Sequence, residues 1–132
     1  KIAFGPFRFD GSLAWTDAEA EGSGPAAALD GKRPAQTPRL AATGTLAYRS
    51  ARWQASVTLR HVGAQFEDDL ETDLLPAATT LDAYAEFPLL RGISLVLRGE
   101  NLTDETIVTR NQAGSVDLGT PRTVWAGFKV GL

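Results

Sequence analysis

Five carboxylates lie within seven residues of the chain, and they form its densest group of side chains that could do chemistry. They are Glu67, Asp68, Asp69, Glu71 and Asp73. Oxygen ligands at this density could hold Ca²⁺, but the spacing lacks the EF-hand pattern and its central glycine. We therefore interpret residues 67–73 as a solvated acidic loop, and calcium binding is the alternative.

The side chains that enzymes use for catalysis are scarce. The chain has no cysteine, and His61 is its only histidine. A single histidine leaves none to spare, so neither a histidine-based metal site nor a Ser-His-Asp triad is predicted. Asp82 and Glu86 share one face of a predicted strand. Because arginines lie on the same face, we interpret the two carboxylates as ion-pair partners rather than as acid–base catalysts. The glycines within 5–11 and 22–31 lack phosphate-loop spacing. The sequence predicts neither an enzyme nor a cofactor.

Net charge and the distribution of apolar residues limit the class of protein further. The 132 residues carry 13 Lys and Arg against 16 Asp and Glu, a net charge of −3, which argues against a nucleic-acid partner. No apolar run approaches the roughly 20 residues of a membrane-spanning helix, but alternating strands of a membrane barrel look only weakly hydrophobic. Residues 1–6 do not resemble a signal peptide, so a membrane location requires a mature chain or an excised piece.

Six segments alternate between apolar and polar residues, which is the signature of strands with one apolar face. In the last one, Val124, Ala126, Phe128, Val130 and Leu132 fall on one face. The alanine-rich stretch 17–29 is interrupted by Gly22, Gly24 and Pro25 and is not predicted as a helix. We predict an all-β, antiparallel up-and-down meander of about six strands, at residues 7–16, 39–49, 52–60, 80–87, 93–100 and 123–132.

The connections between these strands differ in length at the two ends of the sheet. Residues 49–52 and 89–92 are tight turns, whereas the other connections are long and rich in Gly, Pro, Asp and Thr, at roughly 17–38, 64–79 and 103–120. Aromatic side chains on the apolar faces gather near the ends of the strands. Short turns, long loops and aromatic girdles are typical of outer-membrane barrels, whose smallest members have eight strands. The chain is therefore predicted to be a segment of a transmembrane β-barrel, and the alternatives are a barrel completed by oligomerisation and a small open soluble sheet.

Three motifs sharpen this prediction. Asn101-Leu102-Thr103-Asp104-Glu105 follows the fifth strand, Gly119-Thr120-Pro121-Arg122 opens the sixth, and Gln36-Thr37-Pro38-Arg39 opens the second. In this order they resemble the C-terminal end of TonB-dependent outer-membrane receptors. Without that resemblance, Asn101 and Asp104 are residues that bond nearby backbone and end a strand. Pro121 is tolerated at a strand's first residue, and Arg122 can bridge acidic groups.

The last strand resembles the signal that the barrel-assembly machinery recognises, with a glycine followed by apolar residues three and five positions later. Gly127, Val130 and Leu132 occupy those positions, and Phe128 lies between them on the apolar face. The family usually ends in an aromatic residue, so Leu132 departs from its pattern. In the intact barrel this strand would join a first strand that the chain does not contain.

The resemblance implies a receptor in the bacterial outer membrane that imports a scarce nutrient such as a ferric siderophore or cobalamin. Residues 1–132 would be the C-terminal part of a barrel with roughly 22 strands, and its partners would be the missing strands, the plug domain, the TonB complex, the assembly machinery and the lipid bilayer. Alone it would not transport. The alternative is a soluble lipocalin-like β-barrel that binds a small apolar ligand; the two differ in whether the apolar face points outward to lipid or inward.

Overall fold

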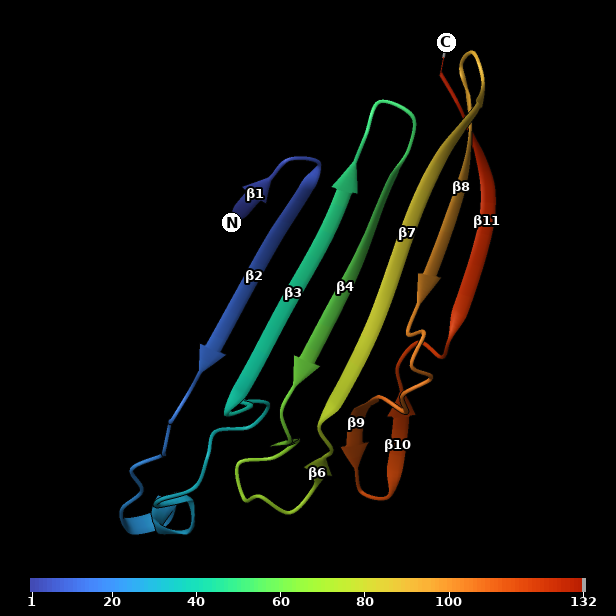
Figure 1. Cartoon of the computed structure of the whole chain (residues 1–132). Coiled ribbons are helices and arrows are strands. Elements are labelled where there is room, and N and C mark those ends of the chain that lie inside the picture. Colours follow the sequence, from blue (N-terminus) through green and yellow to red (C-terminus); the bar gives the residue numbers. More distant parts are fainter. Residues whose placement is uncertain (132) are drawn as a thin grey trace.

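The computed structural model describes residues 1–131, and it is dominated by one antiparallel sheet of seven strands in the order β1-β2-β3-β4-β7-β8-β11 (Figure 1). Neighbouring strands of this sheet follow one another along the chain, apart from two short hairpins inserted in the connections, so it is an up-and-down meander. Its strands are β1 (Ile2–Phe4), β2 (Phe7–Trp15), β3 (Leu40–Arg49), β4 (Gln54–Val62), β7 (Ala78–Leu90), β8 (Ile93–Glu100) and β11 (Thr123–Val130).

The predicted all-β meander is confirmed, and the structure adds detail at the strand ends. The short strand β1 at the N-terminal edge is a seventh member of the sheet. Trp53 lies just before β4 rather than inside it. The last predicted strand, 123–132, is β11 over Thr123–Val130, and Leu132 lies outside the described residues.

The register of the strands aligns their apolar positions into one continuous face. Leu46 of β3 stands opposite Val57 of β4, which stands opposite Ala83 of β7. Ala83 in turn pairs with Gly99 of β8, and Gly99 pairs with Val124 of β11. Because side chains alternate along every strand, this register puts most apolar side chains on one side of the sheet and the charged ones on the other. Val96 and Trp125 are exceptions that lie on the charged side.

The two ends of the sheet differ as the sequence predicts. Tight turns close one end, and Figure 1 shows the long connections gathered at the other. The β7–β8 turn has only Arg91 and Gly92 between the strands, and Gly92 adopts the positive φ of +76° that such a turn needs. In the β3–β4 turn, the Ser50 hydroxyl accepts hydrogen bonds from the backbone N–H groups of Arg52 and Trp53, both at 3.2 Å.

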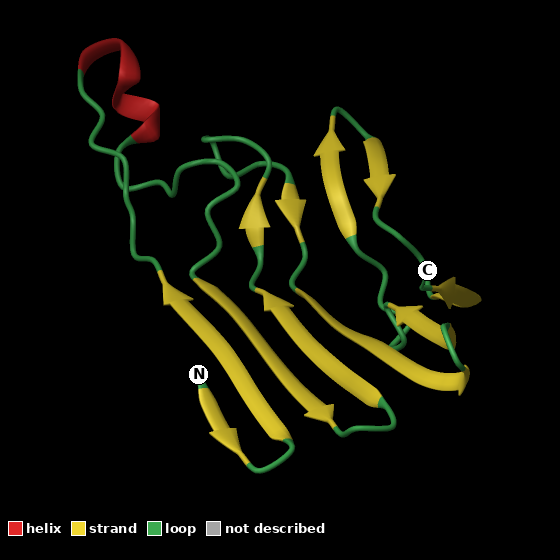
Figure 2. Cartoon of the chain, turned by 90° about the horizontal axis from the view of Figure 1, so that it is seen from above, coloured by secondary structure: helices red, strands yellow, loops and turns green. Residues whose placement is uncertain are grey.

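The long connections contain local structure that the sequence analysis did not predict (Figure 2). A 3₁₀ helix, η1 (Gly24–Leu29), forms in the alanine-rich stretch, where Pro25 is tolerated because it lies in the first turn. Strands β5 (Gln65–Phe66) and β6 (Leu74–Leu75) pair around the acidic residues, and β9 (Val108–Gln112) pairs with β10 (Ser115–Leu118). No helix within residues 1–131 is long and apolar enough to cross a membrane.

The sheet has no hydrophobic core of its own. Within residues 1–131 the only buried large hydrophobic side chain is Leu75, which belongs to the short strand β6 and not to the seven-stranded sheet. Large side chains of the apolar face are instead exposed, for example Leu13 at 73% and Phe128 at 71%. A continuous apolar face of this kind needs an apolar cover, because contiguous apolar patches on soluble monomers rarely exceed a few hundred Å².

Candidate functional site: the loop end of the sheet

The buried side chain of Asn101 joins the two motifs that flank the last long connection. Asn101 is 3% exposed, and its Nδ2 donates to the carbonyl oxygens of Glu105 at 2.8 Å and Thr120 at 3.1 Å. Its Oδ1 accepts the backbone N–H of Glu105 at 3.0 Å. Its own backbone N–H donates to Asp82 Oδ1 at 2.9 Å. One amide therefore ties the end of β8 to the segment that leads into β11.

Other residues of the two motifs reinforce this junction. Arg122 Nη2 bonds Asp104 Oδ2 at 3.1 Å, so the pair bridges the entrance and the exit of the connection. The Gly119 N–H donates to the Ile107 carbonyl at 2.8 Å. Pro121 precedes β11, where it removes no ladder donor, and its carbonyl accepts the Thr123 hydroxyl.

Leu102 lies on the apolar face. A Cβ placed on Gly99 would come within 2.7 Å of a Leu102 methyl, so the leucine packs directly over this glycine. The Leu102 N–H donates to the Leu81 carbonyl at 2.8 Å and extends the ladder between β7 and β8 by one bond. The absence of a side chain at Gly99 thus leaves the space that Leu102 fills.

The acidic loop uses Asp68 to organise its own backbone. The Asp68 carboxylate accepts the N–H groups of Leu70, Thr72 and Asp73, at 2.8, 3.0 and 2.8 Å. These bonds, that from Asp73 foremost, lower the pKa of Asp68 below its ordinary value. Residues 1–131 contain no group of three His, Cys, Asp or Glu side chains arranged so that it could hold a metal ion.

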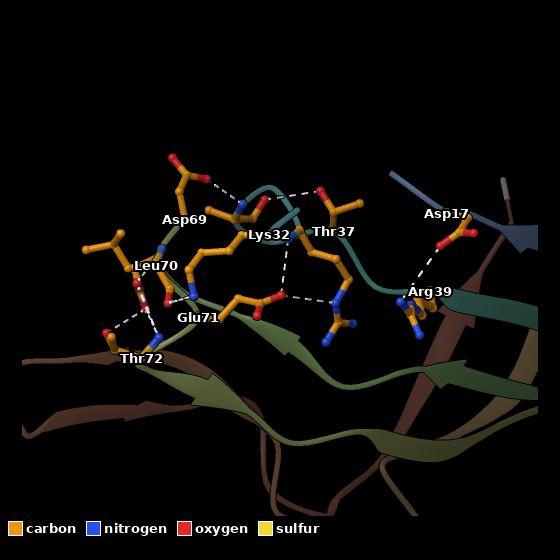
Figure 3. A network of polar contacts seen from close by, with 11 residues as sticks. Asp17, Lys32, Thr37, Arg39, Asp69, Leu70, Glu71 and Thr72 are labelled. Carbon is orange, nitrogen blue, oxygen red and sulfur yellow. Dashed lines mark hydrogen bonds and ion pairs between the residues drawn. The ribbon is translucent and has the colours of Figure 1, made fainter. Parts of the chain in front are cut away.

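Asp69 and Glu71 of this loop contact the preceding long connection (Figure 3). Glu71 Oε1 accepts the Arg33 N–H at 3.1 Å and lies 3.5 Å from the Arg33 guanidinium. Asp69 Oδ1 accepts the Ala35 N–H at 2.7 Å, and the Lys32 ammonium donates to the Leu70 carbonyl at 2.9 Å. The two loops are therefore held together by side chains more than 30 residues apart in sequence.

The third long connection joins the same assembly. Asn111 Nδ2 donates to the Leu74 carbonyl at 3.2 Å, and β9 lies against β6. Arg33 and Asn111 were not identified from the sequence. The one available signal for Arg33 was the basic pair Lys32-Arg33, whose charge is opposite to that of 67–73.

The polar face of the sheet carries its own network. Glu86 accepts hydrogen bonds from Tyr84 Oη at 2.7 Å, Gln54 Nε2 at 2.9 Å and Lys129 Nζ at 3.3 Å, and thereby links β4, β7 and β11. Arg98 pairs with Glu100 at 2.6 Å and stacks over Trp125. Asp82, on the same face, accepts the backbone N–H of Asn101, so both carboxylates of β7 take part in hydrogen bonds.

His61 lies on the apolar face, in phase with Val57 and Leu59 of β4. It stands opposite Thr79, and its Nδ1 lies 2.8 Å from the Thr79 hydroxyl. The ring's polar tip is therefore satisfied by a cross-strand neighbour at the loop end of β4.

The residues of the predicted assembly signal lie on the edge strand β11. Phe128 and Val130 point to the apolar face opposite Leu95 and Ile93, and are 71% and 65% exposed. Gly127 alternates to the other face. Leu132, the fourth member, is outside the described residues.

Comparison with known proteins defines the class. A family described as "TonB dependent receptor-like, beta-barrel" matches residues 2–102, more than half of the chain. The chain therefore belongs to the TonB-dependent receptor β-barrel family, a family of receptors rather than enzymes. No curated protein matches it.

Solved structures agree on the fold. The siderophore receptor PiuA from Acinetobacter baumannii superposes with a TM-score of 0.80 at 18% identity, over 94% of this chain and 19% of that receptor. The ferric citrate transporter FecA gives 0.81 at 17%, over 95% and 21%. BauA, the ferric preacinetobactin receptor from Acinetobacter baumannii, gives 0.76 at 21%, over 95% and 20%. The chain spans about a fifth of the length of these receptors.

Proposed function

We propose that this chain is the C-terminal wall of an outer-membrane receptor that imports a scarce nutrient such as a ferric siderophore or cobalamin. The exposed apolar face supports this proposal most directly, because a lipid bilayer supplies the cover that the sheet itself lacks. In the proposed arrangement the charged face lines the lumen, opposite the plug domain, and the three long connections face the outside.

Energy for transport would come from the TonB complex through the plug, so residues 1–132 would contribute wall and loops and would not transport alone. The assembly machinery would recognise β11 through Gly127, Phe128, Val130 and Leu132. The nature of the cargo is left open between the nutrient classes, since similar structures include ferric siderophore receptors and a copper transporter.

The test uses the full-length protein in a Gram-negative host. Cells that express it are supplied with a panel of labelled ferric siderophores and with labelled cobalamin, with and without a functional TonB complex. We expect the protein in the outer-membrane fraction and accumulation of one cargo only when TonB is present. A protein that fractionates as a soluble monomer and binds a fatty acid internally would instead support the lipocalin-like alternative.

A further inference from the structure

Two hollows lie on the charged face of the sheet, at the end where the tight turns are. The first, of about 200 Å³, is lined at the β3–β4 turn by Arg49, Arg52, Gln54, Glu86 and Lys129. The second, of about 240 Å³, is lined by Arg8 and shares Arg49 and Gln54 with the first, so the two adjoin. Both are smaller than the ~300–1,000 Å³ typical of small-molecule sites, which suits individual side chains of a neighbouring polypeptide.

Glu86 contributes a carboxylate to the first hollow, and its charge is already used within the sheet. It accepts hydrogen bonds from Tyr84 Oη, Gln54 Nε2 and Lys129 Nζ, and its side chain is only 12% exposed. The ammonium of Lys129 lies 3.3 Å from Glu86 Oε1. The one negative and the one positive charge of this network therefore balance.

Arg49 and Arg52 have no such balance. Within residues 1–131 neither guanidinium takes part in an ion pair, and both residues are exposed. Arg8, in the second hollow, does have a carboxylate partner, since it lies 3.8 Å from Asp10. Arg49 and Arg52 therefore leave the two hollows with an excess of positive charge.

The surroundings of these two arginines change when the lumen is filled. In a barrel of about 22 strands the wall side chains leave the lumen open, and a plug occupies it. A plug that covers the charged face removes water from Arg49 and Arg52, and a charge that loses its water without a counter-charge is strongly destabilising. In the described part of the chain, Glu86 is the only acidic residue that lines either hollow, and it is already paired. The counter-charge therefore has to come from the segment that covers the arginines.

We propose that Arg49 and Arg52 hold an acidic segment of the plug domain against the turn end of the barrel wall. The planar guanidinium group favours carboxylates, which it binds through two parallel hydrogen bonds. Cargo or a free anion suits this position less well, because the turn end lies on the periplasmic side in the proposed orientation, away from the long external connections. The proposal rests on the function proposed above, and it adds the chemistry of the plug contact and its place on the wall.

The test uses the full-length receptor in isolated outer membranes and a carbodiimide, which joins an amine to a carboxylate in contact with it. The variants Arg49→Lys and Arg52→Lys keep the positive charge and supply the amine. We expect mass spectrometry to find each new amine joined to an Asp or Glu of the plug. The natural pair of Lys129 and Glu86, whose atoms are 3.3 Å apart, reports that the reagent has reached this face.

Arg60→Lys is the matched control, because Arg60 is also on the charged face and outside any ion pair within residues 1–131. Its hollow contains the carboxylates of Asp82 and Glu100. We therefore expect its new amine to join these residues of the wall and not the plug.

A second measurement tests how much the contact contributes to holding the plug. The double variant Arg49→Gln, Arg52→Gln should raise the rate at which added protease cleaves the plug by about tenfold or more, because the charge-assisted bonds of two guanidinium groups are lost. Arg60→Gln should stay within about twofold of wild type, since wall carboxylates surround it. The difference between the double variant and wild type should shrink at about 1 M salt, which screens ionic contacts.

New amines at positions 49 and 52 that stay unlinked, or that join only residues 1–131, a second receptor copy or another envelope protein, would overturn the inference. Equal cleavage rates for the double variant and Arg60→Gln would do the same. TonB-dependent uptake by the same cells separates the two proposals. Uptake without the cross-link refutes this inference alone, whereas a receptor that is absent from the outer membrane refutes the proposed function as well.

Discussion

Replacement of Asn101 should loosen the junction between β8 and β11 by a predictable amount. Asn101→Ala removes the three hydrogen bonds that the buried side chain makes with backbone groups, at 2.8, 3.0 and 3.1 Å. The Thr103 hydroxyl also reaches Asn101 Oδ1, at 3.2 Å, but it keeps the Thr79 carbonyl as an acceptor in the variant. At about 1 kcal/mol per bond the loss is about 3 kcal/mol. Asn101 also adopts a φ of +48°, and alanine there adds about 1 kcal/mol. Since 1.4 kcal/mol corresponds to about a tenfold change, local opening should rise roughly a thousandfold.

Hydrogen exchange of the full-length receptor measures this opening at the Glu105 amide, which donates directly to Asn101 Oδ1. The variant Asn101→Gly tolerates the positive φ and loses only the side-chain bonds, so its exchange should rise roughly a hundredfold. Asn111→Ala removes one exposed bond elsewhere and serves as the control. Exchange at Glu105 that stays within about threefold of wild type in Asn101→Ala would refute the reasoning. Equal exchange rates at Glu105 in the Ala and Gly variants would refute only the contribution assigned to the positive φ of the backbone.

Two further predictions concern other parts of the chain. The pKa of the Asp68 carboxylate is lowered in the folded loop, chiefly by the hydrogen bond from the Asp73 N–H. The ionised carboxylate therefore stabilises the loop fully above its ordinary pKa of 3.8, and this stabilisation is lost as the pH falls through the lower pKa of the folded state. Pepsin should cleave the wild-type loop more readily as pH falls through that window, while Asp68→Asn is cleaved readily throughout; parallel pH profiles would contradict this. Gly92→Ala should reduce the folded, heat-modifiable fraction of the receptor, because its Cβ would lie 2.8 Å from the Gly131 carbonyl oxygen. Gly114→Ala has a similar positive φ in open space and should show only the cost of that conformation, about 1 kcal/mol, so equal defects in the two variants would argue against the contact.

Local patterns determined much of the fold in advance. Alternation with a period of two identifies a strand and its apolar face without knowledge of any partner, and it located β2, β3, β4, β7, β8 and β11. Pro25 and the neighbouring glycines signalled only irregular backbone, so η1 was missed. The short strand β1 was also missed, because three residues carry too little alternation to be recognised.

The candidate site was likewise predicted only in part. The sequence placed Asn101 and Asp104 at a strand end and Arg122 at a strand start, since each has a local propensity for such a position. The bond from Asn101 to the Thr120 carbonyl and the pair of Arg122 with Asp104 could not be predicted, because the third long connection must first fold back on itself.

The use of the acidic residues was likewise decided by tertiary structure. In sequence, residues 67–73 carry five like charges, which favour a solvated loop and leave calcium binding as the alternative. In the folded chain Asp68 caps its own turn, while Asp69 and Glu71 bond the backbone of Ala35 and Arg33. The strands and the polarity of their faces follow from local alternation, because they depend on neighbours within a few residues. The loop contacts depend on the register that brings distant strands together, and that register exists only in the folded sheet.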